Sequence, residues 1–130
     1  MPVTFDRIAK GETYSRPRLA GMWGYSGYEA LARGVVTPRD THFIILFVTE
    51  DKQPFQEQYS DRLNGDVLHW EGPTDHFAEE RMVNASDNRD EIHVFHRLRH
   101  HSDFTYLGKA KIIEVQRLGH RPSRFTFRLE

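Results

Sequence analysis

The chain has 130 residues and no cysteine, with 38% hydrophobic and 28% charged residues. This length suits a single domain, 1–130, and this composition supports a packed core and argues against disorder. The absence of cysteine excludes disulfides, a thiolate zinc site and a cysteine nucleophile, and it fits a cytoplasmic protein. The longest apolar run, Phe43 to Val48, is too short to cross a bilayer, so we expect no membrane contact.

The formal net charge is only −1, but the charges are unevenly distributed along the chain. Residues 1–49 hold six basic and four acidic side chains, residues 50–90 hold four and eleven, and residues 91–130 hold eight and four. This asymmetry is compatible with one acidic face and one basic face, and a basic face can bind phosphate. The alternative is that the charges are solvated and scattered over the surface.

The first predicted element is a short helix that begins after Ser15. Serine is a favoured N-cap, and Pro17 is tolerated in the first turn because its missing N–H has no partner there. Leu19, Met22 and Trp23 fall on one face at helical spacing, and the glycine that follows ends the helix.

Two strands and a second helix follow. The spacing predicts a short helix over Tyr28–Arg33 that ends at Gly34. Phe43–Val48 is rich in β-forming residues and has no polar position, which predicts a central strand buried on both faces. Val67–Trp70 predicts another short strand, entered through the turn signal Asn64–Asp66.

The last third of the chain is mostly strand by pattern. A helix is predicted to begin at 73–75, with apolar residues at helical spacing behind it. Ile92–His96 predicts a strand, and Phe104–Val115 predicts a longer strand that bends at Gly108. Arg124–Leu129 alternates strictly between polar and apolar residues, so it predicts a strand with one buried face.

These elements predict an α+β fold with five or six strands and two or three short helices. Because long crossover helices are missing, we expect a curled, mostly antiparallel sheet or a barrel. No phosphate-binding glycine loop, GxSxG elbow or HExxH motif occurs in the sequence. We therefore expect no catalytic residue, no cofactor and no metal, and we interpret the chain as a binding module rather than an enzyme.

Four histidines, His93, His96, His100 and His101, crowd the predicted strand at 92–96 and the loop after it. They suggest a metal site or a general base. On a regular strand, however, His93 and His96 point to opposite faces. The other two lie among basic and polar residues, where contact with solvent or phosphate is the expected role.

A second group of residues suits the recognition of a planar heterocycle. Tyr59 and Asp61 share a face of any extended stretch, and Trp70 lies on a nearby predicted strand. A carboxylate accepts a hydrogen bond from an exocyclic amine, and the aromatic rings offer stacking surfaces. The alternative, which spacing alone favours, is that the aromatic residues belong to the core and that Asp61 pairs with an arginine.

Seven short segments in a fixed order carry a family resemblance. They are Tyr14–Arg16, Gly34–Pro38, Ile45–Lys52, Tyr59–Leu63, Leu68–Gly72, Ile92–Arg97 and Phe104–Lys109. With this pattern, the chain resembles a domain of unknown function at the C-terminus of restriction-type helicases that carry a phospholipase-D-like nuclease. It also resembles the N-terminal domain of McrA-like HNH endonucleases of actinobacteria.

The resemblance implies a domain that selects DNA for a linked HNH nuclease in a type IV-like restriction system. Such domains often resemble SRA or PUA barrels, and SRA domains flip 5-methylcytosine out of double-stranded DNA into an aromatic pocket with a carboxylate. By this analogy, Tyr59, Asp61 and Trp70 would form the modified-base pocket. The chain lacks an HNH motif of its own, so we expect it to be part of a longer protein.

Basic side chains on one face would hold the DNA backbone; the candidates are Arg16, Arg33, Arg97, Arg99, His100, His101, Lys109 and Arg124. Two other functions remain open. One is a protein-interaction or scaffold domain of a restriction system without base recognition. The other is a small metal-dependent hydrolase that uses the histidine cluster.

Overall fold

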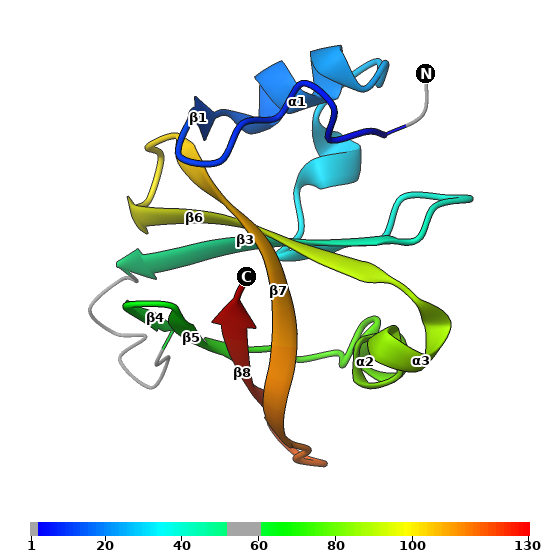
Figure 1. Cartoon of the computed structure of the whole chain (residues 1–130), viewed down its shortest axis with the longest axis vertical. Coiled ribbons are helices and arrows are strands. Elements are labelled where there is room, and N and C mark those ends of the chain that lie inside the picture. Colours follow the sequence, from blue (N-terminus) through cyan, green and yellow to red (C-terminus); the bar gives the residue numbers. More distant parts are fainter. Residues whose placement is uncertain (1–2, 52–60) are drawn as a thin grey trace.

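The computed structural model describes residues 3–51 and 61–130, which form one curled sheet with short helices at its edges (Figure 1). The strands are β1 (Thr13–Tyr14), β2 (Val35–Val36), β3 (Phe43–Asp51), β4 (Arg62–Asn64), β5 (Val67–Glu71), β6 (Glu91–Arg99), β7 (Phe104–Gln116) and β8 (Arg124–Leu129). The helices are α1 (Arg16–Met22), the 3-10 turn η1 (Glu29–Leu31), α2 (Glu79–Val83) and α3 (Ala85–Asn88).

The strand order is β2-β3-β6-β7-β8-β5-β4, with β1 added to the start of β7. Every pair is antiparallel except β3 and β6, which run parallel with Phe43 opposite Glu91 and Asp51 opposite Arg99. The chain makes this parallel pair possible by crossing over through β4, β5, α2 and α3. The prediction of a mostly antiparallel, curled sheet with short helices is confirmed.

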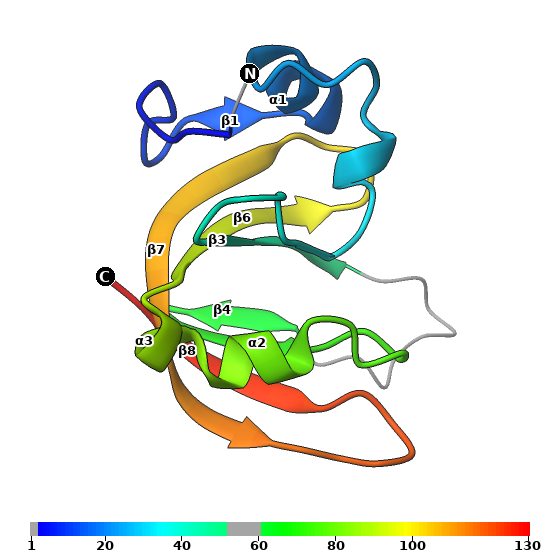
Figure 2. The ribbon, with the colours of Figure 1, turned by 90° about the vertical axis from the view of Figure 1, so that its right-hand side faces the viewer.

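Strand β7 is the element that curls the sheet. Its first half pairs with β6 and its second half pairs with β8, so it passes from one layer to the other, as Figure 2 shows. The predicted bend at Gly108 is present: its φ is +94°, and the β6–β7 register shifts between Val94 and Phe95. Glycine adopts this conformation without a Cβ penalty, and the bulge increases the local twist.

Helix α1 forms as its sequence predicts. The Ser15 hydroxyl accepts a hydrogen bond from the Arg18 backbone N–H at 3.1 Å, and Pro17 lies in the first turn. The second predicted helix, over Tyr28–Arg33, is reduced to the single 3-10 turn η1.

The helix predicted to begin at 73–75 begins later, at Glu79. His76 and Ala78 have φ values of 58° and 61°, in the left-handed region, so the chain cannot continue as a right-handed helix through them. A turn closed by the His76 N–H and the Pro73 carbonyl occupies the beginning of the predicted helix instead. That prediction is wrong over residues 73–78.

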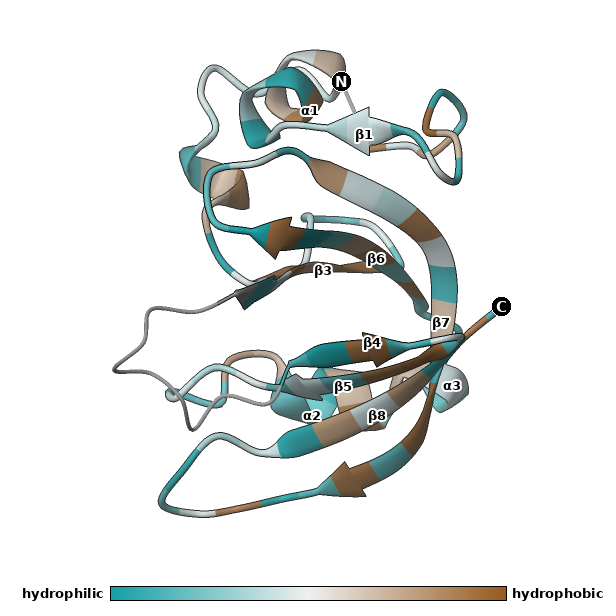
Figure 3. Cartoon of the chain, turned by 90° about the vertical axis from the view of Figure 1, so that its left-hand side faces the viewer, coloured by the Kyte–Doolittle hydropathy of each residue, from teal (hydrophilic) through white to brown (hydrophobic). Residues whose placement is uncertain are grey.

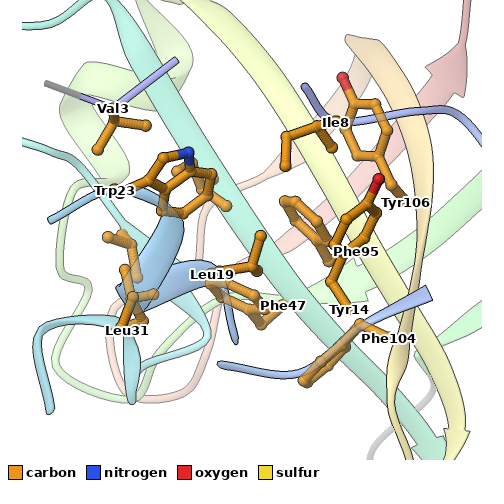
Figure 4. Packing of buried hydrophobic residues seen from close by; sticks show 13 residues of the cluster. Val3, Ile8, Tyr14, Leu19, Trp23, Leu31, Phe47, Phe95, Phe104 and Tyr106 are labelled. Carbon is orange, nitrogen blue, oxygen red and sulfur yellow. The ribbon is translucent and has the colours of Figure 1, made fainter. Parts of the chain in front are cut away.

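The central strand β3 is buried on both faces, as predicted, and it separates two hydrophobic clusters. Ile45 and Phe47 point into one cluster together with residues of α1. Figure 4 shows the side chains of this cluster, among them its aromatic rings. Ile44, Leu46 and Val48 point into the other cluster, between β3 and the layer of β5 and β8. Figure 3 shows the resulting run of hydrophobic residues along β3. This double burial explains why β3 has no polar alternation.

His93 is a buried polar residue beside the first cluster, with 3% of its surface exposed. Its Nδ1 lies 2.6 Å from the Tyr106 hydroxyl, its Nε2 lies 2.9 Å from a carboxylate oxygen of Glu91, and its ring stacks on Phe5 at 3.6 Å. Burial lowers the pKa of His93, although the Glu91 carboxylate acts in the opposite direction. Burial also raises the pKa of Tyr106 to about 12. The network therefore holds a neutral imidazole and a neutral phenol at neutral pH.

This network predicts acid sensitivity. Because the folded-state pKa of His93 lies below the usual imidazole value of about 6.5, the unfolded chain binds the extra proton first. The free energy of unfolding should therefore decline as the pH falls below about 6.5, until the lowered pKa is passed. Urea unfolding at a series of pH values measures this decline. His93→Gln, which cannot titrate, should show a shallower decline, and an identical decline would contradict the assignment.

Candidate nucleic-acid interface

Several segments that connect the strands lie at one end of the molecule, on the right of Figure 2. We call this region the loop end and define it as residues 32–34, 61, 70–78, 97–103 and 117–124. Backbone pairing and contacts join its parts: Asp51 lies opposite Arg99, Glu71 lies opposite Arg124, and the Gly72 N–H donates to the Ser123 carbonyl at 2.9 Å. Loops carried on a rigid sheet are common positions for binding residues.

The structure brings Asp61 and Trp70 together at the loop end. Asp61 comes directly before β4, and the β4–β5 register, with Arg62 opposite His69, places it across from Trp70. An Asp61 carboxylate oxygen accepts a hydrogen bond from the Glu71 backbone N–H at 2.8 Å. The third predicted pocket residue, Tyr59, lies outside the described residues.

Asp61 and Trp70 line a cavity of about 450 Å³. The other lining residues come from the segment before β2, from β3 and from the β5–α2 connection; they are Arg33, Gly34, Phe47, Glu71, Gly72, Pro73, Thr74 and Asp75. The cavity thus combines an aromatic edge, a buried carboxylate and basic and acidic groups at its rim. Its volume lies within the range of ligand pockets.

Trp70 has a second role in the core. It is only 5% exposed, and its ring packs against Phe125 and Phe127 at centroid distances of 5.5 and 6.1 Å. The alternative interpretation of Trp70 as a core residue is therefore correct for most of its surface, while one edge lines the cavity. Asp61 is 8% exposed, so its carboxylate is also held within the protein rather than in open solvent.

Arg33 stands at the rim of the cavity. One of its guanidinium nitrogens lies 3.0 and 2.9 Å from the two carboxylate oxygens of Asp75, and the guanidinium lies 4.3 Å from the centre of the Phe77 ring. The hydrogen bond from Arg33 lowers the pKa of Asp75, and the Phe77 backbone N–H adds to this effect. The predicted backbone-binding arginine is thus occupied by a carboxylate of its own chain.

Arg16 and Arg97 are half-buried and bridge secondary-structure elements. Arg16 Nε donates to the Leu31 carbonyl at 2.5 Å, and Arg97 Nε donates to the Thr49 hydroxyl at 2.7 Å. Both guanidinium groups lie over the Phe104 ring, at 4.9 and 4.3 Å. Burial, followed by the nearby Arg97 charge, lowers the pKa of Arg16 to about 10. Arg16 and Arg97 therefore join elements of the fold, and their contact with DNA stays a prediction.

The remaining predicted backbone contacts separate into two places. Arg99 is exposed at the end of β6, His100 and His101 are exposed in the β6–β7 connection, and Arg124 is exposed at the start of β8. All four belong to the loop end. Lys109 lies at the opposite side, where β7 bends and its carbonyl accepts from the Glu130 N–H. The structure therefore does not place Lys109 with the others.

Several basic residues of the loop end are missing from the sequence-based selection. Beside the loop end, Arg62 is exposed in β4, and within it Arg117, His120 and Arg121 are exposed in the β7–β8 connection. The last three form a basic run between two predicted strands, which is the pattern that could have indicated them. In the sequence alone, this run is indistinguishable from an ordinary solvated turn. The structure places this turn beside Ser123 and Gly72, next to the cavity wall.

The histidine cluster divides as the strand geometry predicts. His93 packs against Phe5 and Tyr106 beside the first hydrophobic cluster, whereas His96 Nε2 lies 2.5 Å from Glu50 Oε2 on the other face of β6. That carboxylate also accepts from the Leu63 N–H at 3.2 Å, so the pair joins β3 and β6 to β4. Within 3–51 and 61–130, no group of three His, Cys, Asp or Glu residues is arranged to hold a metal ion. No helix among those residues is both long and apolar enough to span a membrane.

Comparisons with protein-family models and with curated proteins found no match. Among solved structures, the chain is similar to the SUVH5 SRA domain in complex with hemimethylated CG DNA, with a TM-score of 0.67 and 15% identity. The same domain in complexes with fully methylated CG DNA and with methylated CHH DNA gives TM-scores of 0.61 and 0.60, at 14% and 12% identity. Each match covers 100% of this chain and 94% of the other. The chain therefore has an SRA-like fold.

Proposed function

We propose that this domain binds double-stranded DNA and recognises a modified base, 5-methylcytosine in the first instance, which leaves the base stack and enters the cavity at Asp61 and Trp70. The observation that carries the proposal is this cavity, with a buried carboxylate, at the loop end of the sheet. The similar structures contain an SRA domain bound to methylated DNA, which supports the same class of ligand.

The chemistry of the cavity suits a cytosine. The Asp61 carboxylate would accept a hydrogen bond from the exocyclic amine, which thymine lacks. Flipping a base costs a few kcal/mol, and stacking on an aromatic side chain recovers about 1–3 kcal/mol of it. Burial of the 5-methyl group adds about 0.8 kcal/mol. We therefore expect a preference over plain cytosine of a few-fold, and a larger one where the methyl group fits tightly.

The exposed basic residues of the loop end would hold the phosphates on either side of the flipped base. We assign this role to three exposed arginines of the loop end: Arg99 is the last residue of β6, Arg121 lies in the β7–β8 connection, and Arg124 begins β8. Such contacts position the duplex and carry no sequence information themselves. Specificity would therefore reside in the cavity, and affinity in the surrounding arginines.

The proposal extends to a cellular role, which rests on the ordered motifs described above. The domain would deliver a linked HNH nuclease to modified DNA in a cytoplasmic, type IV-like restriction system. In this arrangement the domain itself performs no chemistry, and cleavage belongs to the linked nuclease. Because binding and cleavage then belong to different domains, we expect the isolated domain to bind DNA without cutting it, with or without added divalent cations.

A binding experiment with three duplexes tests the proposal. The duplexes share one sequence and carry cytosine, 5-methylcytosine or 5-hydroxymethylcytosine at a single position. Fluorescence anisotropy at low salt should show the tightest binding to the methylated duplex. Equal affinity for all three would refute recognition of a modified base. Binding to none of them at low salt, where phosphate contacts are strongest, would refute DNA binding and favour a protein-interaction domain.

A further inference from the structure

Three arginines of the loop end are each held by a carboxylate from one short segment, residues 71–80. Arg33 binds Asp75 at 2.9 Å, and Arg117 binds Glu80 at 2.9 Å and reaches Glu79 at 3.5 Å. Arg124 Nε lies 3.9 Å from a Glu71 carboxylate oxygen. Arg33 lies just before β2, whereas Arg117 and Arg124 lie at the two ends of the β7–β8 connection. The segment therefore pairs with two separate parts of the chain rather than within one local turn.

Two of the three pairs lie in solvent and are open to exchange, whereas the Glu71 side chain that faces Arg124 is only 9% exposed. The Arg33 and Asp75 side chains are 47% and 61% exposed, and those of Arg117 and Glu80 are 49% and 73% exposed. Exposed ion pairs contribute little to stability, so their replacement by another anion is inexpensive. They are therefore poor candidates for holding the fold together, in contrast to the half-buried Arg16 and Arg97.

The backbone of the segment is shaped to present its carboxylates. His76 and Ala78 adopt left-handed φ values, which form a compact loop between β5 and α2. Asp75 also accepts a hydrogen bond from the Phe77 N–H at 3.1 Å, which fixes its side chain toward Arg33. Strained backbone of this kind persists where the surrounding structure holds it, and it is enriched at functional sites.

A carboxylate held by a guanidinium occupies the same donors that a phosphate would use. Resting on the proposed function, we propose that the carboxylates of residues 71–80 compete with DNA phosphates for Arg33, Arg117 and Arg124. This competition lowers affinity for every duplex, so a stable complex forms only where a base in the cavity adds its own contacts. The segment thus sets how much affinity the contacts in the cavity must add before a stable complex forms, and it leaves the affinity ratio between two duplexes unchanged.

The competition also accounts for the charge of the chain. DNA-binding domains are usually basic, yet this one has a net charge of −1, with the acidic excess concentrated in residues 50–90. If the domain depended on phosphate contacts alone, removal of these acidic residues would raise its affinity for DNA. If the domain must avoid binding the large excess of unmodified DNA, acidic residues beside its arginines are useful because they weaken that binding.

Variants that remove the charge of the competing carboxylates test the inference. Asp75→Asn and Glu80→Gln keep the side-chain shapes and each remove one negative charge. Each should tighten binding to the unmodified duplex about fivefold, and both together about 25-fold, measured by anisotropy at about 50 mM salt. The methylated duplex should gain by a similar factor. The effect should vanish for Asp75→Asn introduced into Arg33→Gln, because the released arginine is then missing.

Asp87→Asn is the matched control. It changes the net charge by the same amount, but Asp87 is an exposed residue of α3, away from the loop end. Gains from Asp75→Asn and Glu80→Gln no larger than the gain from Asp87→Asn would overturn the inference while leaving DNA binding intact. Failure of every variant and of the unaltered chain to bind any duplex would instead refute the proposed function, and the inference with it.

Discussion

Replacing Trp70 with alanine should lower the free energy of unfolding by about 3–5 kcal/mol, because it opens a large cavity in the second hydrophobic cluster. Trp70 is 5% exposed and packs against the rings of Phe125 and Phe127, at the place where β5 pairs with β8. Urea unfolding followed by circular dichroism measures the loss. An unchanged midpoint would mean that Trp70 lies outside the packed core.

Trp70→Phe is the control that separates stability from binding. It keeps an aromatic ring against Phe125 and should lose much less stability than the alanine variant. It also shortens the edge that reaches the cavity. A defect in DNA binding by folded Trp70→Phe therefore reports on the cavity, whereas a defect in Trp70→Ala alone reports only on folding.

The long strands were predictable because their patterns extend over many residues. In β8, alternation places Phe125 and Phe127 in the core and leaves Arg124 and Arg128 exposed. The unbroken apolar pattern of β3 reflects its position between two clusters. The bend of β7 was predictable because glycine is the residue that accepts a φ of +94° within a strand.

The short elements were not predictable in the same way. Strands β1, β2 and β4 contain two or three residues each, too few to show any periodicity. Their strand character comes from distant partners, such as Val36 pairing with Ile45 and Thr13 pairing with Thr105. The late start of α2 has a similar cause, because the left-handed conformations of His76 and Ala78 carry no signal in their residue types.

The candidate site shows the same division. The proximity of Asp61 and Trp70 follows from the β4–β5 hairpin, whose turn signal is in the sequence, although spacing alone left both residues open to other roles. The pairing of Arg33 with Asp75 joins residues 42 positions apart, so no local pattern indicates it. Sequence reasoning therefore named Asp61 and Trp70, which line one cavity, and missed the ion pair of Arg33 with Asp75. The role of these residues in binding DNA stays a prediction.

Replacing Asp61 with asparagine should weaken binding to the methylated duplex by roughly 10- to 100-fold while leaving the fold intact. The amide oxygen can still accept the hydrogen bond from the Glu71 N–H, which Asp61 accepts at 2.8 Å. In the proposed complex, the asparagine NH₂ would meet the cytosine amine donor to donor, and the two groups cannot form a hydrogen bond. Asp66→Asn, an exposed residue at the far end of β4, controls for the change in charge.

The same variant makes a sharper prediction about which base is preferred. Thymine and 5-methylcytosine share the methyl group, but thymine carries an acceptor oxygen where cytosine carries the amine. The affinity for a mismatched T·G duplex, divided by the affinity for the methylated C·G duplex, should therefore be higher for Asp61→Asn than for the unaltered chain. Comparing this ratio between the two proteins cancels the easier flipping of a mismatched base. A ratio that stays constant would show that Asp61 does not contact the amine edge of the base, even if DNA binding itself is strong.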